Sequence, residues 1–397
     1  MRFRCTPIPL PSRVGFLPAL ACAITLSLAA PAPVAAQTRP PGPGDRASEA
    51  PWQTRLRADL AQADPQGAVG VHVRDLDTGA TVSRHLDQPW YLASMVKVPV
   101  AIAVMRGIDA GDFRLDTPLT VRASDYVDGA GPTSRQPVGK ALSIRYLLDQ
   151  MIIQSDNMAT DMLIDLVGAA EVNALMATLV PDGFRRITTL GEVRRQIYGH
   201  LAPHAERLSG RDLILLNRQR ADGARLRLLS QLLETPVEQF RLPTLDAAYD
   251  AYYASGLNTG RLDAYGQLLA LLADGRLMSP QSTAHLLKVM TRVATGTYRI
   301  KAGLPSDVGF AHKTGTQRRR ICDAGLIRAA DTEAARERRV VVVACVRDVL
   351  PLERAEAMLM QVGAALCRSG LVTQGVPDAS SCQAAAPARL PAAAVER

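Results

Sequence analysis

Short apolar or alternating runs lie towards both ends of the chain, and helical periodicity fills the stretch between them. Runs of this length that are rich in β-branched residues and bounded by glycine or charged turns are typical of strands. Strands at both ends with helices between them predict one mixed α/β domain rather than two separate domains. The predicted strands are 68–73, 81–83, 308–315, 321–327 and 340–346.

Apolar residues that recur every three or four positions predict helices along the rest of the chain. Residues 200–257 also have a helical but irregular pattern, with Ser209 to Asp212 as a capping sequence. Thr259 is the predicted cap of the helix that ends near Gly275. The predicted helices are 52–61, 94–105, 144–151, 158–166, 171–179, 259–275, 282–290 and 352–367.

Residues 1–36 have the pattern of a signal peptide. They contain three arginines and no acidic residue, and an apolar stretch from Val14 to Ala30 precedes Val34-Ala35-Ala36, which suits cleavage before Gln37. A membrane anchor is the alternative, but prolines interrupt the stretch and no later stretch is long and apolar enough to span a bilayer. We therefore expect a periplasmic or secreted protein without stable membrane insertion.

The composition on either side of the folded part indicates unstructured segments. Residues 37–50 are rich in proline, glycine and alanine and predict a flexible leader. Residues 376–397 are rich in alanine and proline and predict a disordered tail. The folded domain is then expected over 51–375.

The net charge gives little indication of a partner. It is +8 for the whole chain and +5 once the three arginines of the signal peptide are removed. The surplus is spread out, apart from Arg318-Arg319-Arg320, and only 4% of the residues are aromatic. For an exported chain, these features do not favour nucleic acid as a partner.

Four cysteines remain after cleavage, namely Cys322, Cys345, Cys367 and Cys382. They contain no Cys-x-x-Cys pair and the histidines are scattered, so no metal site is predicted. If the strands 321–327 and 340–346 form a hairpin centred between residues 333 and 334, Cys322 and Cys345 face each other within disulfide range. Cys367 and Cys382 are the second predicted pair in an oxidising compartment.

Ser94-Met95-Val96-Lys97 is the first stretch that indicates catalysis. Residues three apart on a helix lie on one face, so the Ser94 hydroxyl and the Lys97 amine are expected to meet. A serine becomes a good nucleophile when a neighbouring base takes its proton, and an amine is a base only when uncharged. Lowering a lysine pKa from about 10.4 to about 7 costs roughly 4–5 kcal/mol, which burial and nearby positive charge must supply.

Two further motifs follow in order, Ser155-Asp156-Asn157 and Lys313-Thr314-Gly315. Each alone has a structural explanation, a helix cap for the first and a hairpin end for the second. The ordered set of three resembles the penicillin-recognising serine hydrolases, which include class A β-lactamases and penicillin-binding proteins. The resemblance runs from about Trp52 to Cys367, and Thr295 to Pro305 resembles the stretch that precedes the Lys-Thr-Gly strand in the class A-like branch.

The resemblance implies a fold and a set of roles. The expected fold is an antiparallel sheet of five strands from both chain ends, packed against helices, with the site between the sheet and the helical region. Ser94 would be the acylated nucleophile and Lys97 its proton partner, while Ser155 would pass a proton to the leaving nitrogen. Substrate would be held by Asn157, Lys313, Thr314, Gly315 and Thr316, and the backbone N–H groups of Ser94 and Thr316 would form the oxyanion site.

The chain departs from the family pattern in two places. The stretch of sequence between Ser155 and Lys313 is longer than usual in the family. Residues 200–257 are the predicted helical insertion, which we expect near the cleft. After Gly315, three arginines stand where many β-lactamases have small residues, with Arg320 the candidate for contact with the substrate carboxylate. Solvated charge at a strand end is the alternative for these arginines.

Glu192 is the candidate for the base that activates water to release the acyl-enzyme. It lies at about the expected distance from Ser155, but the usual Glu-x-x-x-Asn pattern is replaced by Glu192 and Gln196. The alternatives are that Glu192 is favoured by the dipole at a helix start or that it pairs with Arg194 or Arg195.

These observations predict an exported, monomeric serine hydrolase of class A β-lactamase type that needs no cofactor and no metal. A D,D-peptidase, amidase or esterase that acts on peptidoglycan-like peptides is the nearest alternative. The alternative from another class is a non-hydrolysing β-lactam sensor, which generally needs a membrane-spanning segment.

Overall fold

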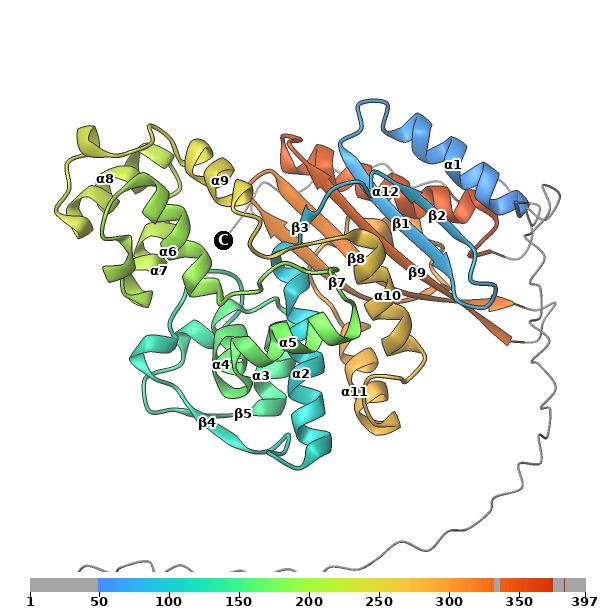
Figure 1. The fold of residues 1–397 in the computed structure, drawn as a ribbon, viewed down its shortest axis with the longest axis horizontal. Helices are drawn as coiled ribbons and strands as arrows, with labels where there is room; N and C mark the ends of the chain where they lie inside the picture. The colour runs from blue at the N-terminus through green and yellow to red at the C-terminus, as the bar shows by residue number, and fades with distance from the viewer. Residues whose placement is uncertain (1–48, 332–335, 374–381, 383–397) are drawn as a thin grey trace, which may run out of the picture. The chain divides into compact units, whose positions relative to one another are not determined.

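A computed structural model describes residues 49–331, 336–373 and 382. The predicted signal peptide, nearly all of the leader and all of the tail except Cys382 lie outside the described residues. Within them, the mixed α/β fold predicted from the sequence is confirmed, because a single five-stranded sheet unites both ends of the chain (Figure 1).

The sheet has the order β2-β1-β9-β8-β7, and all neighbouring strands are antiparallel. The middle strand β9 contains four consecutive valines, Val340 to Val343, each of them fully buried, because both faces of the sheet are covered. The strands are β1 (Val69–Asp75), β2 (Thr81–Arg84), β7 (Gly309–Gln317), β8 (Arg320–Asp331) and β9 (Arg336–Arg347).

The register of the β8–β9 hairpin is the one predicted from the sequence. Cys322 pairs directly with Cys345, with 4.0 Å between their Cα atoms, and the two form a disulfide. Cys367 and Cys382 form the second disulfide. Both predicted cysteine pairs are therefore confirmed.

One face of the sheet is covered by the first and last helices of the described chain, α1 (Pro51–Ala63) and α12 (Leu352–Ser369). The apolar face of α1 buries Trp52, Leu56 and Leu60 in a core shared with α12. The valines of β1 and β9 on this face of the sheet complete the core. The predicted helical periodicity at both ends thus corresponds to one layer of two helices.

The other face packs against the larger core, which contains α2 and α10. Helix α2 is apolar nearly all round, as expected for a helix buried between other elements. The helices of this part are α2 (Lys97–Ala110), α3 (Ile144–Ile153), α4 (Asn157–Val167), α5 (Ala169–Leu179), α10 (Leu262–Ala273) and α11 (Pro280–Met290).

Residues 200–257 form helices, and together with α6 they make a lobe beside the sheet (Figure 1). Ser209 and Asp212 form the predicted capping box at the start of α7. The helices of the lobe are α6 (Leu190–Leu201), α7 (Gly210–Arg218), α8 (Asp222–Leu233) and α9 (Leu245–Ala254).

The predicted cap at Thr259 is wrong. Thr259 lies in the short strand β6 (Thr259–Gly260), where it pairs with Tyr91 of β3 (Trp90–Tyr91), and α10 begins three residues later at Leu262. The tertiary pairing of β3 with β6 therefore outweighs the local capping preference of threonine. A second pair of short strands joins β4 (Pro118–Thr120) and β5 (Ala141–Ser143).

Among the described helices, none is by itself both long and apolar enough to cross a membrane. Helices α4 and α5 pass such a test only as a pair, and they are bent by 82° relative to each other.

Candidate active site

Ser94 lies in a tight 3-10 turn, η1 (Ala93–Val96), which leads directly into α2. In this geometry residues three apart eclipse, so Ser94 and Lys97 lie on the same side, and the Lys97 N–H also donates to the Ser94 carbonyl. The preceding residue, Ala93, has a left-handed backbone with φ of 48°, a conformation that is rare for residues other than glycine and is concentrated at functional sites.

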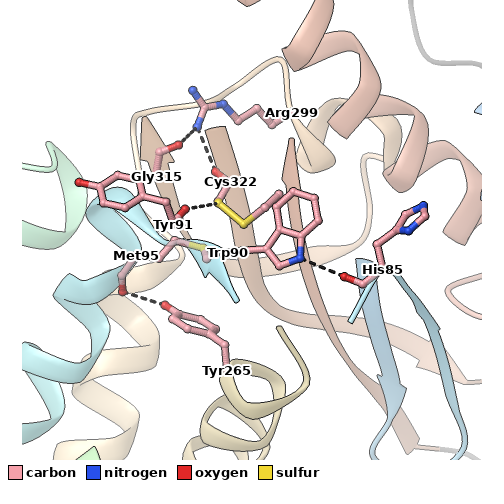
Figure 2. Close-up of a disulfide and its surroundings, with 9 residues drawn as sticks. His85, Trp90, Tyr91, Met95, Tyr265, Arg299, Gly315 and Cys322 are labelled. Atoms are coloured by element: carbon pink, nitrogen blue, oxygen red, sulfur yellow. Dashed lines mark hydrogen bonds between the residues drawn. A yellow bond between two sulfur atoms is a disulfide. The ribbon is translucent and has the colours of Figure 1, made fainter. Parts of the chain in front are cut away.

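The turn that carries Ser94 is supported by a tyrosine hydroxyl and by a disulfide. Figure 2 shows the Tyr265 hydroxyl donating to the carbonyl of Met95, at 2.9 Å. The segment that enters the turn packs on the Cys322–Cys345 disulfide, where the Tyr91 carbonyl oxygen lies 3.5 Å from Cys322 Sγ. Ser94 is only partly buried, and its hydroxyl makes no hydrogen bond within the part of the chain that the structure describes.

Lys97 joins the first motif to the second. Its side chain is fully buried, and Nζ donates to Asn157 Oδ1 at 2.8 Å and to the Ser155 carbonyl at 2.5 Å. Nζ also lies 3.2 Å from the Ser155 hydroxyl oxygen. Ser155 itself has a left-handed backbone, with φ of 59°. A strained backbone position is therefore found directly before Ser94 and at Ser155.

Asp156 fills the structural role predicted as the alternative for its motif. One carboxylate oxygen accepts the N–H of Ala159 and caps α4, and the other accepts the N–H of Thr133 at 2.8 Å. Gly129 and Gly131 lie over the motif with positive φ, and a Cβ on either would clash with Asn157 or Asp156. The cap and the glycine loop together fix the orientation of Asn157, whose Nδ2 donates to the Asp128 carbonyl.

Lys313 reaches the same serine from the edge strand β7. Its Nζ donates to the Ser155 hydroxyl oxygen and to the Thr314 carbonyl, each at 2.9 Å. The lysine is fully buried, whereas Thr316, three residues further along the strand, is exposed. The three motifs thus converge on the Ser155 hydroxyl, between α2 and the edge of the sheet.

Gly315 is required here for a reason other than substrate approach. A Cβ at this position would come within 2.4 Å of the Leu92 carbonyl, so glycine lets β7 pack closely against the segment that leads to Ser94.

Arg299 was not identified from the sequence as a site residue, although the stretch that contains it was. Its buried guanidinium donates to the Gly315 carbonyl at 2.9 Å (Figure 2). It also donates to the Thr316 hydroxyl at 2.8 Å and pairs with Glu356 on α12. In the same stretch, the Thr295 hydroxyl lies 2.5 Å from that of Thr314. These contacts hold the end of β7 in place.

Burial lowers the pKa of Lys97 to about 7, and the positive charge of Arg194 adds to the effect. The negative charges of Asp156 and Asp161 act in the opposite direction. Burial also lowers the pKa of Lys313 well below its usual value, and the charge of Lys97 lowers it further. The two buried lysines thus repel each other, and the effect is on the pKa of Lys313.

Glu192 lies in the first turn of α6, where its N–H is capped by Thr189. Its Oε1 accepts from Arg186 Nη2 at 3.0 Å and from Gln196 Nε2 at 2.7 Å, and the side chain is 36% exposed. Gln196 therefore contacts Glu192 directly. Within the described chain, no hydrogen bond joins Glu192 to Ser94, Lys97 or Ser155.

The turn that carries Glu192 is nevertheless fixed next to the site. Asp161 on α4 accepts the N–H groups of Leu190 and Gly191, at 2.7 and 2.8 Å. Burial raises the pKa of Asp161 to about 7, and the two backbone N–H groups and Lys97 oppose that rise. No motif indicated this carboxylate in the sequence.

The arginines after Gly315 tie the β7–β8 turn to the helical lobe. Arg318 donates to Asp222 at the start of α8, with Nη2 to Oδ2 at 2.7 Å, and to Asp246 on α9. Arg319 pairs with Asp250 on α9. We call these three arginine–aspartate pairs the turn–lobe contacts.

Arg320 is engaged by an aspartate and by a tyrosine ring. Its Nη1 donates to Asp348 at 2.6 Å, and the guanidinium lies 4.5 Å from the centre of the Tyr253 ring. Both groups satisfy its charge within the protein.

A family model described as the "Beta-lactamase enzyme family" matches residues 52–369. The chain belongs to this family. β-Lactamase VEB-1 of Pseudomonas aeruginosa is 22% identical to it over 250 residues, which cover 62% of this chain and 66% of that protein. The chain spans about half to two thirds of the length of the curated relatives it matches first.

Several solved structures share the fold. A β-lactamase from Sphaerobacter thermophilus superposes with a TM-score of 0.59 at 24% identity, over 81% of this chain and 99% of that one. PBP-A superposes with a TM-score of 0.58 at 22% identity, over 79% and 94% of the two chains, and a mutant of PBP-A has been solved as an acyl-enzyme complex with penicillin G. These likenesses confirm the predicted β-lactamase-like architecture.

Proposed function

We propose that this protein is a serine hydrolase that opens the amide bond of β-lactams through an acyl-enzyme on Ser94. The observation that carries the proposal is that Lys97 and Lys313 both contact the Ser155 hydroxyl. Ser94, on the turn that leads into Lys97, is only partly buried. A buried amine with a pKa of about 7 is a competent base near neutral pH.

In the proposed acylation, uncharged Lys97 takes the proton of the Ser94 hydroxyl while Ser94 Oγ attacks the lactam carbonyl carbon. The resulting oxyanion is stabilised by the backbone N–H groups of Ser94 and Thr316, each worth roughly 2.7–4 kcal/mol in such sites. Ser155 then donates its proton to the leaving nitrogen as the C–N bond breaks, and it recovers a proton from Lys97. This sequence leaves Ser94 acylated and Lys97 uncharged.

The substrate is proposed to be held on both sides of the reacting bond. Lys313, Thr314 and Thr316 would meet the carboxylate, with Arg299 positioning Thr316 through its hydroxyl. Asn157 would hold the substrate amide from the other side, since its Oδ1 and Nδ2 are oriented by Lys97 and the Asp128 carbonyl. Arg320 is left out of this set because Asp348 and Tyr253 engage it.

For release of the acyl group we propose Glu192 as the base that activates water. It lies in a turn that Asp161 fixes next to Lys97, and its partly exposed carboxylate is accessible to water. The step would add water across the ester, returning Ser94 to its hydroxyl form and freeing the opened product.

A second candidate is favoured by the contacts of Glu192. Its Oε1 accepts hydrogen bonds from Arg186 and Gln196, which leaves only Oε2 to activate water and favours slow release. Slow release would make the protein a penicillin-binding D,D-peptidase that acts on peptidoglycan-like peptides and keeps its penicillin adduct.

We also propose export to the periplasm or the outside, from the signal-peptide pattern of residues 1–36, and a monomer that works without a cofactor.

The test uses the purified chain from Gln37 and a chromogenic cephalosporin. Continuous turnover supports the hydrolase, whereas a burst of one equivalent followed by little turnover supports the penicillin-binding peptidase. Absence of both, in protein whose circular dichroism shows a folded state, would contradict acylation at Ser94.

A further inference from the structure

Arg194 is a nearly buried arginine whose donors are only partly used. It projects from α6, with a side chain that is 16% exposed. Its Nε donates to Asp128 Oδ1 at 2.8 Å, and Nη1 lies 3.4 Å from the Tyr249 hydroxyl. Nη2 makes no hydrogen bond to any residue in the described ranges, and it is not among their enclosed, unpartnered atoms. An arginine has five N–H donors, so this side chain keeps an open edge.

The surroundings of Arg194 place it at the proposed site. Its partner Asp128 also accepts, through its carbonyl, the Nδ2 of Asn157 at 2.7 Å. After burial, the charge of Arg194 also lowers the pKa of Lys97. Its charge also acts on the hydroxyls of Tyr91 and Tyr253, which form part of an aromatic group with rings 4.9 Å apart.

Arg194 and Lys313 approach the site from opposite elements. Lys313 comes from the edge strand β7, whereas Arg194 comes from α6 and is linked to Asn157 through Asp128. In the proposed function Lys313 binds the carboxylate next to the scissile amide, and Asn157 binds the amide of the acyl side chain. A group that extends beyond that amide on the Asp128 side of Asn157 would meet Arg194.

We propose that Arg194, supported by Asp128 and Tyr249, forms a subsite for a carboxylate on the acyl side chain of the substrate. Guanidinium groups bind carboxylates through charge-assisted hydrogen bonds, and these are stronger where water is largely excluded. Asp128 occupies only the Nε side and fixes the plane of the guanidinium, which pre-organises the open edge. This inference rests on the proposed function and names its specificity: acyl side chains that carry an anionic group.

The test compares two substrates that differ by one carboxylate, benzylpenicillin and its α-carboxy analogue. The measurement is the ratio of kcat/KM, or of the acylation rate constants, for the carboxylated over the neutral compound. In Arg194→Gln we expect this ratio to fall roughly tenfold or more, because a hydrogen bond to a charged group is lost. Arg194→Lys, which keeps the charge but not the planar donor set, should fall by a smaller factor.

Two further variants separate loss of the subsite from loss of folding and from a general effect of losing an arginine. Arg194→Gln leaves the buried Asp128 carboxylate unpaired, so the double variant Arg194→Gln/Asp128→Asn removes both charges together. Arg195→Gln is the matched control, since the neighbouring arginine on α6 donates to the Leu208 carbonyl instead. The ratio should fall in the double variant and stay at the unmutated value in the control.

An unchanged ratio in Arg194→Gln and in the double variant, with both proteins folded, would overturn the subsite while leaving acylation at Ser94 intact. Failure of the unmutated protein to react with either penicillin would instead overturn the proposed function, and the subsite with it. The same ratio measured with acyl-D-Ala-D-Ala peptides, with and without a side-chain carboxylate, distinguishes a peptide from a lactam as the source of the anionic group.

Discussion

Lys97 and Lys313 are joined through a single hydroxyl, that of Ser155, at 3.2 and 2.9 Å from their Nζ atoms. Two ammonium groups that share one buried oxygen repel each other, so the arrangement favours a state in which at least one amine is uncharged. Lys97 can take a proton from Ser94 when it is itself uncharged, a state that its own burial favours.

The first prediction concerns pH. Because the pKa of Lys97 is about 7, the acylation rate should rise about tenfold per pH unit below pH 7 and level off above it, where the amine is uncharged. Stopped-flow acylation between pH 5.5 and 8.5 measures this. A profile that is flat over that range would rule out Lys97 as the base.

Asp161 provides the control for this profile, because its pKa is also raised to about 7 by burial. The negative charge of Asp161 raises the pKa of Lys97, so Asp161→Asn should move the acid limb to lower pH and keep its shape. Loss of the limb in this variant would assign it to Asp161 instead.

The second prediction concerns the nucleophile. Ser94→Ala should lower acylation by about 10³-fold or more, since the nucleophile acts as one unit with its base. Mass spectrometry after incubation with benzylpenicillin measures the adduct. Covalent attachment at the unmutated rate would mean that a different side chain is acylated.

The third prediction concerns Glu192. If it activates water, Glu192→Gln should acylate at the unmutated rate and then retain the acyl group, which mass spectrometry detects as a stable adduct. Arg186→Gln, which removes the ion pair that holds the Glu192 carboxylate, should release the acyl group at least as fast as the unmutated protein. Unchanged release in Glu192→Gln would make this residue structural and favour the peptidase.

The fourth prediction concerns the disulfides. Mass mapping under non-reducing conditions should find both bridges, Cys322–Cys345 and Cys367–Cys382. Removing the second in Cys367→Ser/Cys382→Ser should lower the free energy of unfolding by up to about 3 kcal/mol, the value for closing a loop of about this length. Urea unfolding measures it, and four free thiols in the native protein would contradict both pairs.

The fifth prediction concerns the turn–lobe contacts. Arg318→Gln should lower the free energy of unfolding by only about 1 kcal/mol, and less at high salt, because Arg318, Asp222 and Asp246 are 29%, 43% and 50% exposed. It should also speed proteolysis within residues 210–254. Arg218→Gln, on the exposed side of α7, is the control and should change neither. Equal proteolysis of all three proteins would mean that the contacts do not hold the lobe.

Much of the fold and of the motif geometry could be predicted from the sequence, because those features are encoded locally. Alternating and apolar runs mark the strands of the sheet, and the hairpin register that places Cys322 opposite Cys345 follows from counting along two strands. The capping box at Ser209 is likewise a local pattern.

The features that were missed depend on residues far apart in the chain. Arg318 contacts Asp246 and Asp222, 72 and 96 positions away, and no local pattern selects those partners among the other aspartates. The pairing of Thr259 with Tyr91 and the packing of Gly315 on Leu92 are likewise tertiary contacts. For the same reason Arg299, Asp161 and Arg194 are identified only from the structure.

The pairing of β1 with β9 also sets the order in which the molecule can fold. Val69 and Val346 are neighbours across the sheet, although nearly all of the described chain lies between them. Closing a loop of that length is slow. Until β9 pairs with β1, the two-stranded hairpin β1–β2 is at best marginally stable. The turn that carries Ser94 packs on Gly315 of β7, so it too lacks its final support until the C-terminal strands arrive. A chain still being synthesised should therefore have no acylating activity until β9 is available, and a truncation before residue 347 should abolish that activity rather than reduce it.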